Sequence, residues 1–359
     1  MIKVKSEHWD QSVIGRTLAN DVISDSGHFL LKQGMVLTNW HLSILQNHLI
    51  EDIFLMDMPQ EPLSNQVEDI FKHRENISII YKESVVEVKR LFQLAISREV
   101  PSLQDFMKPF TPLLESVLKG PNIFLELRHI KGHDEYTYRH SLNVGLLSAT
   151  IGKILLLPID DILQLGRIGF LHDLGKMKVS PQILNKESKL SKNEFDEVKQ
   201  HTIYGKEMIA MMPGENEEIE YGALCHHERL DGSGYPYGLK GDQIPFLSQI
   251  IAVADVYDAI SSDRIYKEKH GPLEALDELL LEVFKGRFNS EIVIPFVEHI
   301  LYGYIGNDVL LDNGTKGRIV QLFKEEIRRP LLKVGEEFID LRKKRDLHIQ
   351  EIFIAPSLV

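Results

Sequence analysis

Cysteine is nearly missing from this sequence of 359 residues, in which Cys225 is the only one. A single thiol excludes an intrachain disulfide and fits a reducing compartment. Long apolar runs are missing as well. The most apolar stretch, residues 141–158, carries Asn143 and Lys153 and is too short for a clear membrane span. The N-terminal segment is too polar for a signal peptide. We therefore expect a cytoplasmic protein without a membrane partner.

Basic residues are fewer than acidic residues. The chain has 41 Lys and Arg against 53 Asp and Glu, which gives a formal net charge of −12. A general nucleic-acid binder needs a broad basic surface to neutralise phosphates, so this balance argues against a nucleic-acid polymer as partner. The same balance still permits a small phosphate ligand that a few local cations would hold.

The length exceeds one ordinary hydrophobic core, so several domains are expected. Residues 1–58 alternate short β-like runs with turns around a helical stretch, which predicts a small α+β module. Residues 59–121 indicate a helical linker region, and residues 122–303 are helical almost throughout. Residues 304–359 predict a small β module that opens with a hairpin. The predicted fold class is therefore mainly α, with small α+β and β modules flanking the helical domain.

Local signals place chemistry-bearing residues near helix ends. Gly175 is expected to end a helix just after the His-Asp pair at 172–173. Ser191 and Glu194 form a capping box, which predicts the start of a helix that carries His201.

The helical region contains imidazole and carboxylate groups, a combination that suits iron, manganese or zinc. The candidate ligands are His140, His172, Asp173, His201, His226, His227 and Asp255. Two neighbouring metals need a shared ligand, and a carboxylate such as Asp173 can bridge them through its two oxygens. Taken singly, each residue is more often an ordinary surface or core residue, and a His at a helix end also favours the helix dipole. Together they favour a metal site.

Longer motifs support this interpretation. Residues 226–245 read HHERLDGSGYPYGLKGDQIP, residues 170–176 read FLHDLGK, and DVYDAISSDRIYK follows at 255–267. This closely resembles the HD-GYP family, bacterial phosphodiesterases of the HD superfamily, over about residues 122–303. The resemblance implies a helical HD-type metal-dependent phosphohydrolase domain.

The family's arrangement implies roles for these residues. One metal would be held by His140, His172, Asp173 and Asp255, and the second by Asp173, His201, His226 and His227. Lys176 resembles the family lysine that acts near the scissile phosphate, so Asp173 and Lys176 are the expected catalytic pair. The cofactors would be two divalent ions, with iron or manganese favoured and zinc, nickel and magnesium left open.

The family's substrate is cyclic di-GMP. The resemblance implies that Arg264 and Lys267 contact phosphate, which an Arg fork can bind through two oxygens. Tyr235 would pack against or hydrogen-bond the ligand. Asp258 is placed with this set and is also a candidate for orienting a metal ligand. A metal-activated hydroxide would cleave the ring to linear pGpG, and a second cleavage would give GMP.

One position departs from a pattern found in part of the family. Tyr136 lies four residues before His140, where some members carry a Glu that helps hold a third metal. A phenol is a poor replacement for a carboxylate ligand. We therefore expect two metals rather than three, and accumulation of pGpG before GMP.

Two other functions stay open. The chain could be a sensor or effector that binds cyclic di-GMP with weak or no turnover, although the complete ligand set favours an enzyme. It could also be an HD hydrolase of another nucleotide. The intact GYP loop argues against this, but another cyclic dinucleotide is not excluded. The flanking modules leave room for a homodimer or for a signalling partner.

Overall fold

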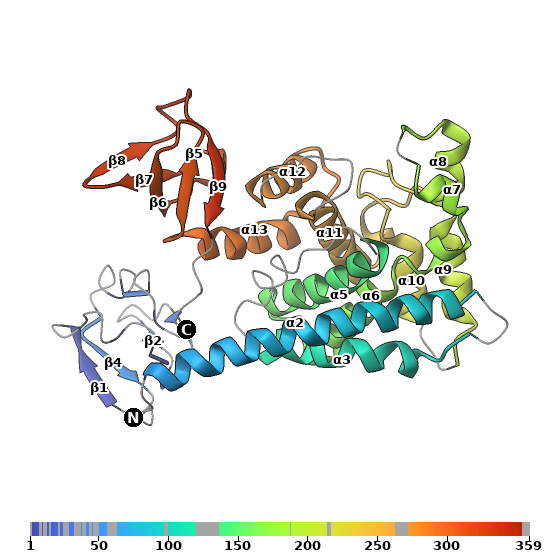
Figure 1. Cartoon of the computed structure of the whole chain (residues 1–359), viewed down its shortest axis with the longest axis horizontal. Coiled ribbons are helices and arrows are strands. Elements are labelled where there is room, and N and C mark those ends of the chain that lie inside the picture. Colours follow the sequence, from blue (N-terminus) through green and yellow to red (C-terminus); the bar gives the residue numbers. More distant parts are fainter. Residues whose placement is uncertain are drawn as a thin grey trace. The chain divides into compact units, whose positions relative to one another are not determined.

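The computed structural model describes residues 63–96, 100–119, 136–186, 188–213, 217–262 and 272–353, with scattered residues between 2 and 55 (Figure 1). The chain forms two compact units, one of residues 1–71 with 355–359 and one of residues 72–354. Among the described helices, none combines the length and hydropathy that a membrane span requires.

The first unit contains short antiparallel strand pairs. β1 (Ile2–Lys5) pairs with β4 (Asp52–Leu55), and β2 (Val22–Ile23) pairs with β3 (Phe29–Leu31). A separate hydrophobic core holds this unit together, and Leu45 is one of its fully buried members.

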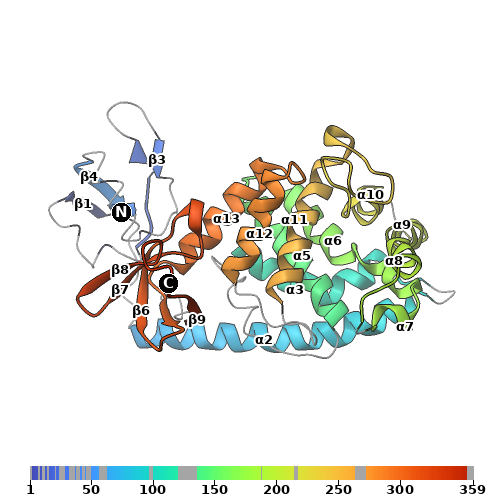
Figure 2. The ribbon, with the colours of Figure 1, turned by 90° about the horizontal axis from the view of Figure 1, so that it is seen from above.

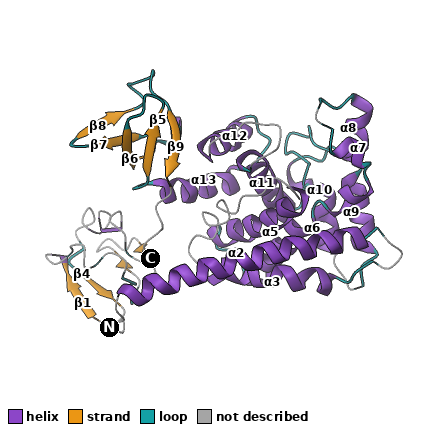
Figure 3. Ribbon diagram, in the orientation of Figure 1, coloured by secondary structure: helices purple, strands orange, loops and turns teal. Residues whose placement is uncertain are grey.

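The second unit is built mainly from helices, which confirms the mainly-α fold class (Figure 3). They are α2 (Leu63–Leu94), α3 (Leu103–Lys119), α5 (Tyr136–Ile154), α6 (Ile159–Leu171), α7 (Pro181–Leu184), α8 (Lys192–Lys199), α9 (His201–Ala210), α10 (Glu217–Cys225), α11 (Phe246–Ser261), α12 (Pro272–Phe284) and α13 (Ser290–Tyr304), with the short 3₁₀ helices η2 (Leu174–Lys178), η3 (Gly241–Gln243) and η4 (Lys324–Glu326).

A five-stranded antiparallel sheet follows α13, in the order β8-β7-β6-β5-β9. Its strands are β5 (Asp308–Leu311), β6 (Lys316–Gln321), β7 (Leu331–Val334), β8 (Glu337–Asp340) and β9 (Ile349–Phe353). The predicted hairpin turn lies between β5 and β6, where Gly314 has a φ of 81° that favours glycine. Buried Val309 and Leu332 of the sheet belong to the same core cluster as Phe296 of α13, and the sheet lies beside α13 in Figures 1 and 2.

Glycines set the distance between α5 and α6. A Cβ on Gly145 would lie 2.9 Å from the Gly166 carbonyl oxygen, and one on Gly169 would lie 2.8 Å from the Val144 carbonyl oxygen. Two helices joined by a short connection run antiparallel, so the first turn of α5 lies near the end of α6. Close packing here therefore fixes the separation between His140 and the segment that follows Leu171.

Two local predictions need correction. The capping box of Ser191 and Glu194 is present, but its helix α8 ends at Lys199 and His201 begins α9. The side chains of His201 and Thr202 bond the carbonyls of Val198 and Lys199, which competes with the helical ladder.

Gly175 does not end a helix. It lies inside η2, after α6 has ended at Leu171. Its role is close approach, because a Cβ there would lie only 1.9 Å from the His201 carbonyl oxygen.

We expect Gly169→Ala to destabilise the protein by up to about 2 kcal/mol. The strain of overpacking costs roughly 1–3 kcal/mol and outweighs a gain in helix propensity of about 1 kcal/mol. Gly205→Ala is the matched control, since its Cβ would meet nothing closer than the Ala223 Cβ at 3.5 Å. Urea denaturation measures both variants. A Gly169→Ala protein as stable as Gly205→Ala would contradict the close-packing argument.

Candidate metal centre

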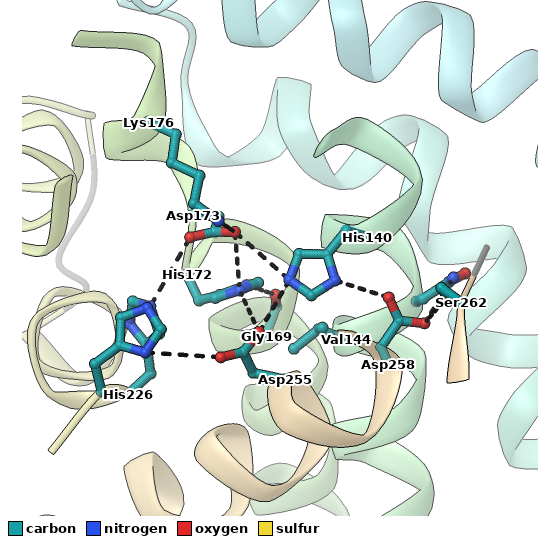
Figure 4. A network of polar contacts seen from close by, with 12 residues as sticks. His140, Val144, Gly169, His172, Asp173, Lys176, His226, Asp255, Asp258 and Ser262 are labelled. Carbon is teal, nitrogen blue, oxygen red and sulfur yellow. Dashed lines mark hydrogen bonds and ion pairs between the residues drawn. The ribbon is translucent and has the colours of Figure 1, made fainter. Parts of the chain in front are cut away.

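Asp173 lies fully buried between α6 and η2, and its two oxygens face different imidazoles (Figure 4). Oδ1 is 3.3 Å from Nε2 of His201 and 3.9 Å from Nε2 of His226. Oδ2 is 3.3 Å from Nε2 of His172 and 3.6 Å from Nε2 of His140. The carboxylate therefore lies between two groups of nitrogen donors.

The structure brings together every ligand predicted from the sequence. One group consists of Asp173, His201, His226 and His227, and the other of His140, His172 and Asp255, with the ligand atoms of each group within 4.8 Å of one another. Asp255 approaches a residue of each group, with Oδ1 3.0 Å from Nε2 of His140 and Oδ2 3.8 Å from Nδ1 of His227. The resemblance implied the same division, with Asp173 added to the group of His140, His172 and Asp255 as the shared residue.

Helix ends orient three of the imidazoles. His172 and His226 each follow the last residue of a helix, and His201 follows α8 after one residue. Nδ1 of each ring bonds the carbonyl three residues earlier, at 2.6 Å for His172, 2.6 Å for His201 and 2.9 Å for His226. The last carbonyls of a helix lack amide partners, so they are available as acceptors. With the proton on Nδ1, the Nε2 lone pair points into the cluster.

The protonation states suit ligands. Burial would raise the pKa of Asp173, but electrostatic interactions with His172 and Lys176 outweigh it and hold the pKa well below its usual value. Burial lowers the pKa of His201 to about 4 and that of His226 well below its usual value. The carboxylate is therefore ionised and these two imidazoles are neutral at pH 7, which are the forms that bind metals.

His140 differs because carboxylates flank both of its ring nitrogens. Burial opposes its protonation, but hydrogen bonds to Asp255 and Asp258 outweigh burial and raise its pKa to about 9. Nδ1 lies 2.7 Å from Asp258 Oδ2, which orients Nε2 toward the metal ligands.

Two buried atoms of the cluster show whether its residues fit a metal cation. Within the described part of the chain, the buried atoms His172 Nε2 and Asp173 Oδ1 have no hydrogen-bond partner. Leaving such atoms unsatisfied is costly. Both atoms are lone-pair donors that face the centre of the cluster, and imidazole with carboxylate suits transition metals. The residues therefore fit divalent cations.

The GYP loop covers the group that contains His227. The Tyr235 ring lies 4.6 Å from the His227 ring, measured between centroids. Glu228, which sequence reasoning assigned no role, is buried and accepts the backbone amides of Tyr237 at 2.8 Å and Leu239 at 3.0 Å. Its position directly after the two ligand histidines ties the loop to the metal groups. In the sequence, a Glu within a motif otherwise rich in turn residues was the only indication of this role.

Lys176 reaches back to the shared carboxylate, with Nζ 2.5 Å from Asp173 Oδ2 (Figure 4).

The carboxylate of Asp258 is occupied by other side chains. Besides His140, it accepts from Asn143 Nδ2 at 2.9 Å and from Ser262 Oγ at 2.9 Å, both at Oδ1. This geometry favours orientation of His140 over substrate contact. Sequence reasoning missed Asn143 and Ser262 because their link to Asp258 spans separate helix turns and elements.

Tyr136, the residue at which the sequence departs from part of the family, lies against His140. Tyr136 begins α5, and its ring stacks on His140 at a centroid distance of 5.5 Å and an angle of 11°. The two proposed phosphate contacts, Arg264 and Lys267, lie outside the described residues.

Comparison with known proteins agrees with this geometry. Residues 123–292 match the HD domain family. A cyclic di-GMP phosphodiesterase of Pseudomonas aeruginosa is 34% identical over 289 residues, which cover 80% of this chain and 68% of the relative. A cyclic di-GMP phosphodiesterase of Thermotoga maritima is 33% identical, over 63% of this chain and 59% of its own length.

Other similarities are more partial or more distant. The 3′3′-cGAMP-specific phosphodiesterase 1 of Vibrio cholerae is 34% identical over 51% of this chain and 43% of its own length. A solved HDG“Y”P protein of Bdellovibrio bacteriovorus shares the fold, with a TM-score of 0.52 at 15% identity over 84% of this chain and 99% of that chain. The resemblance carried by the motifs is thereby confirmed, and the chain belongs to the HD-GYP family of HD-domain proteins.

Proposed function

We propose that this protein is a phosphodiesterase that hydrolyses cyclic di-GMP at a binuclear metal centre. The carrying observation is Asp173, whose oxygens face two separate groups of imidazoles at 3.3–3.9 Å. A carboxylate in this position is the shared ligand that two neighbouring cations require. The names of the Pseudomonas and Thermotoga relatives support the substrate. The single cysteine supports a cytoplasmic location.

When bound, two divalent cations supply Lewis-acid chemistry and make water acidic enough to act as a nucleophile near neutral pH. The chain's own residues do the rest. His140, His172 and Asp255 with Asp173 would hold one ion, and His201, His226 and His227 with Asp173 would hold the other. Imidazole with carboxylate favours iron or manganese for both.

The substrate contacts follow from what surrounds the centre. Lys176 is partly exposed and lies at the shared carboxylate, so its ammonium can offset charge that builds on the scissile phosphate. Tyr235 covers His227 and offers a ring for packing against the ligand. Arg264 and Lys267 are proposed to bind the phosphates.

Asp173→Ala should lose both ions and all turnover, because each group loses its shared ligand. Metal content of the purified variant, measured by plasma mass spectrometry, checks this. Asp196→Ala is the control, since that exposed carboxylate pairs only with Lys199 among the described ion pairs. If the Asp173→Ala protein keeps two ions and activity, the bridging assignment is wrong.

Lys176→Met should lower kcat by about 10²-fold while the protein keeps its metals. The loss reflects one missing donor to the charge of the transition state, for which reported losses are about 10²–10³. Lys178→Met removes a neighbouring lysine that instead pairs with Glu207 at 3.5 Å, and it should leave kcat unchanged. Equal effects of the two substitutions would contradict a specific role for Lys176.

A second substrate deserves a direct comparison, because the Vibrio relative is named for 3′3′-cGAMP. Both cyclic dinucleotides carry two phosphodiesters, so the same centre offers chemistry suited to either. A sensor without turnover is disfavoured, because the seven side chains proposed as ligands come together in two groups that could each hold a cation.

A time course of cyclic di-GMP hydrolysis should show pGpG before GMP. Tyr136 offers no carboxylate for a third ion, and a centre with fewer cations holds the added terminal phosphate of pGpG less well. Chromatography of the products, run in parallel with 3′3′-cGAMP, gives the answer. GMP without any pGpG would break the link between Tyr136 and the product, and turnover of 3′3′-cGAMP alone would replace the proposed substrate.

A further inference from the structure

A chain of hydrogen bonds leads from α2 to a metal ligand. The Tyr81 hydroxyl donates to Asn143 Oδ1 at 2.7 Å, and Asn143 Nδ2 donates to Asp258 Oδ1 at 2.9 Å. Asp258 Oδ2 lies 2.7 Å from His140 Nδ1, and His140 Nε2 faces Asp255. Four side chains from three helices thus connect a residue of the long helix to the ring that would hold an ion.

The polarity of this chain is set from both ends. Asp258 is an acceptor, so the Asn143 amide must turn its NH₂ toward Asp258 and its oxygen away. That oxygen then needs a donor, and the Tyr81 hydroxyl supplies it. Burial and the charge of Asp258 raise the pKa of Tyr81, so its hydroxyl keeps its proton. Each group in the chain therefore holds its neighbour in one orientation.

We propose that Tyr81 is a positioning residue of the metal centre, acting through Asn143 and Asp258 on His140. The inference rests on the proposed metal site. Tyr81 lies before the region that matches the HD family, which begins at residue 123, so it adds a residue that the family motifs do not contain. It lies on α2, in the part of that helix that belongs to the second unit.

The orientation of His140 is sensitive to this support because its other ring nitrogen faces the cluster. Partners that bond a metal-binding imidazole typically change metal affinity by about 10–100-fold when they are replaced. Tyr81 acts two bonds further out, so the lower end of that range applies. The effect should fall on the ion that His140 binds, and not on the ion held by His201, His226 and His227.

Tyr81→Phe removes the hydroxyl and keeps the ring. Metal-free protein titrated with Mn²⁺ by calorimetry should show one of two ions bound about tenfold more weakly, with the other unchanged. The matched control is Ser84→Ala on the same helix. Its buried hydroxyl donates to the Pro109 carbonyl at 2.7 Å, away from the metal groups. Ser84→Ala should bind both ions as the wild type does.

Asn143→Ala tests the route. If Tyr81 acts through Asn143, adding Tyr81→Phe to Asn143→Ala should not weaken Mn²⁺ binding further, because coupled residues are not additive. A fully additive loss overturns the route, and equal losses for Tyr81→Phe and Ser84→Ala overturn a positioning role. If the wild-type protein binds two ions and Tyr81→Phe binds both with the same affinity, this inference alone is overturned. Wild-type protein that takes up no Mn²⁺ overturns the metal centre along with it.

Discussion

A carboxylate that is wholly removed from water has to be matched by positively charged or hydrogen-bonding side chains, or by metal cations. The second unit meets this requirement at Asp173. Four imidazole nitrogens and the Lys176 ammonium approach its two oxygens within 4 Å. Without them the acid would stay protonated and could not serve as a ligand. The depressed pKa of Asp173 and the neutral state of His201 are two consequences of the same packing.

Placing the ligands at helix ends solves a second problem. A buried imidazole that binds a metal through Nε2 needs an acceptor for its Nδ1 proton. The last carbonyls of α6, α8 and α10 are acceptors that the helices leave over, and His172, His201 and His226 use them. His140 lies inside the first turns of α5, where the carbonyls are used by the helix, so it depends on a side chain, Asp258. That difference explains why the supporting network is most extended at His140.

The sequence allowed prediction of the side chains that gather in the two groups, but not of the residues that support them. Spacing and motif identified His226, His227 and Asp255, because a motif records residue types that lie close together along the chain. The bond from Tyr81 to Asn143 joins residues 62 positions apart, a separation that no local pattern spans. The break at Gln200 was also hidden, because a capping box marks where a helix begins and says nothing of the side chains that later compete for its carbonyls.

The helices that precede the family region are part of the metal-binding unit in physical terms. Phe110 of α3 stacks on Phe170 of α6 with centroids 4.7 Å apart, and Phe92 of α2 packs against the same ring. Phe110 also fills the space that the missing side chain of Gly145 leaves. Residues of α2 and α3 therefore pack against α6, the helix that His172 follows. Tyr81, also on α2, bonds to Asn143 of the network that supports His140. Because α2 contacts both the ring of Phe170 on α6 and Asn143 on α5, a displacement of α2 would alter the packing of both helices together.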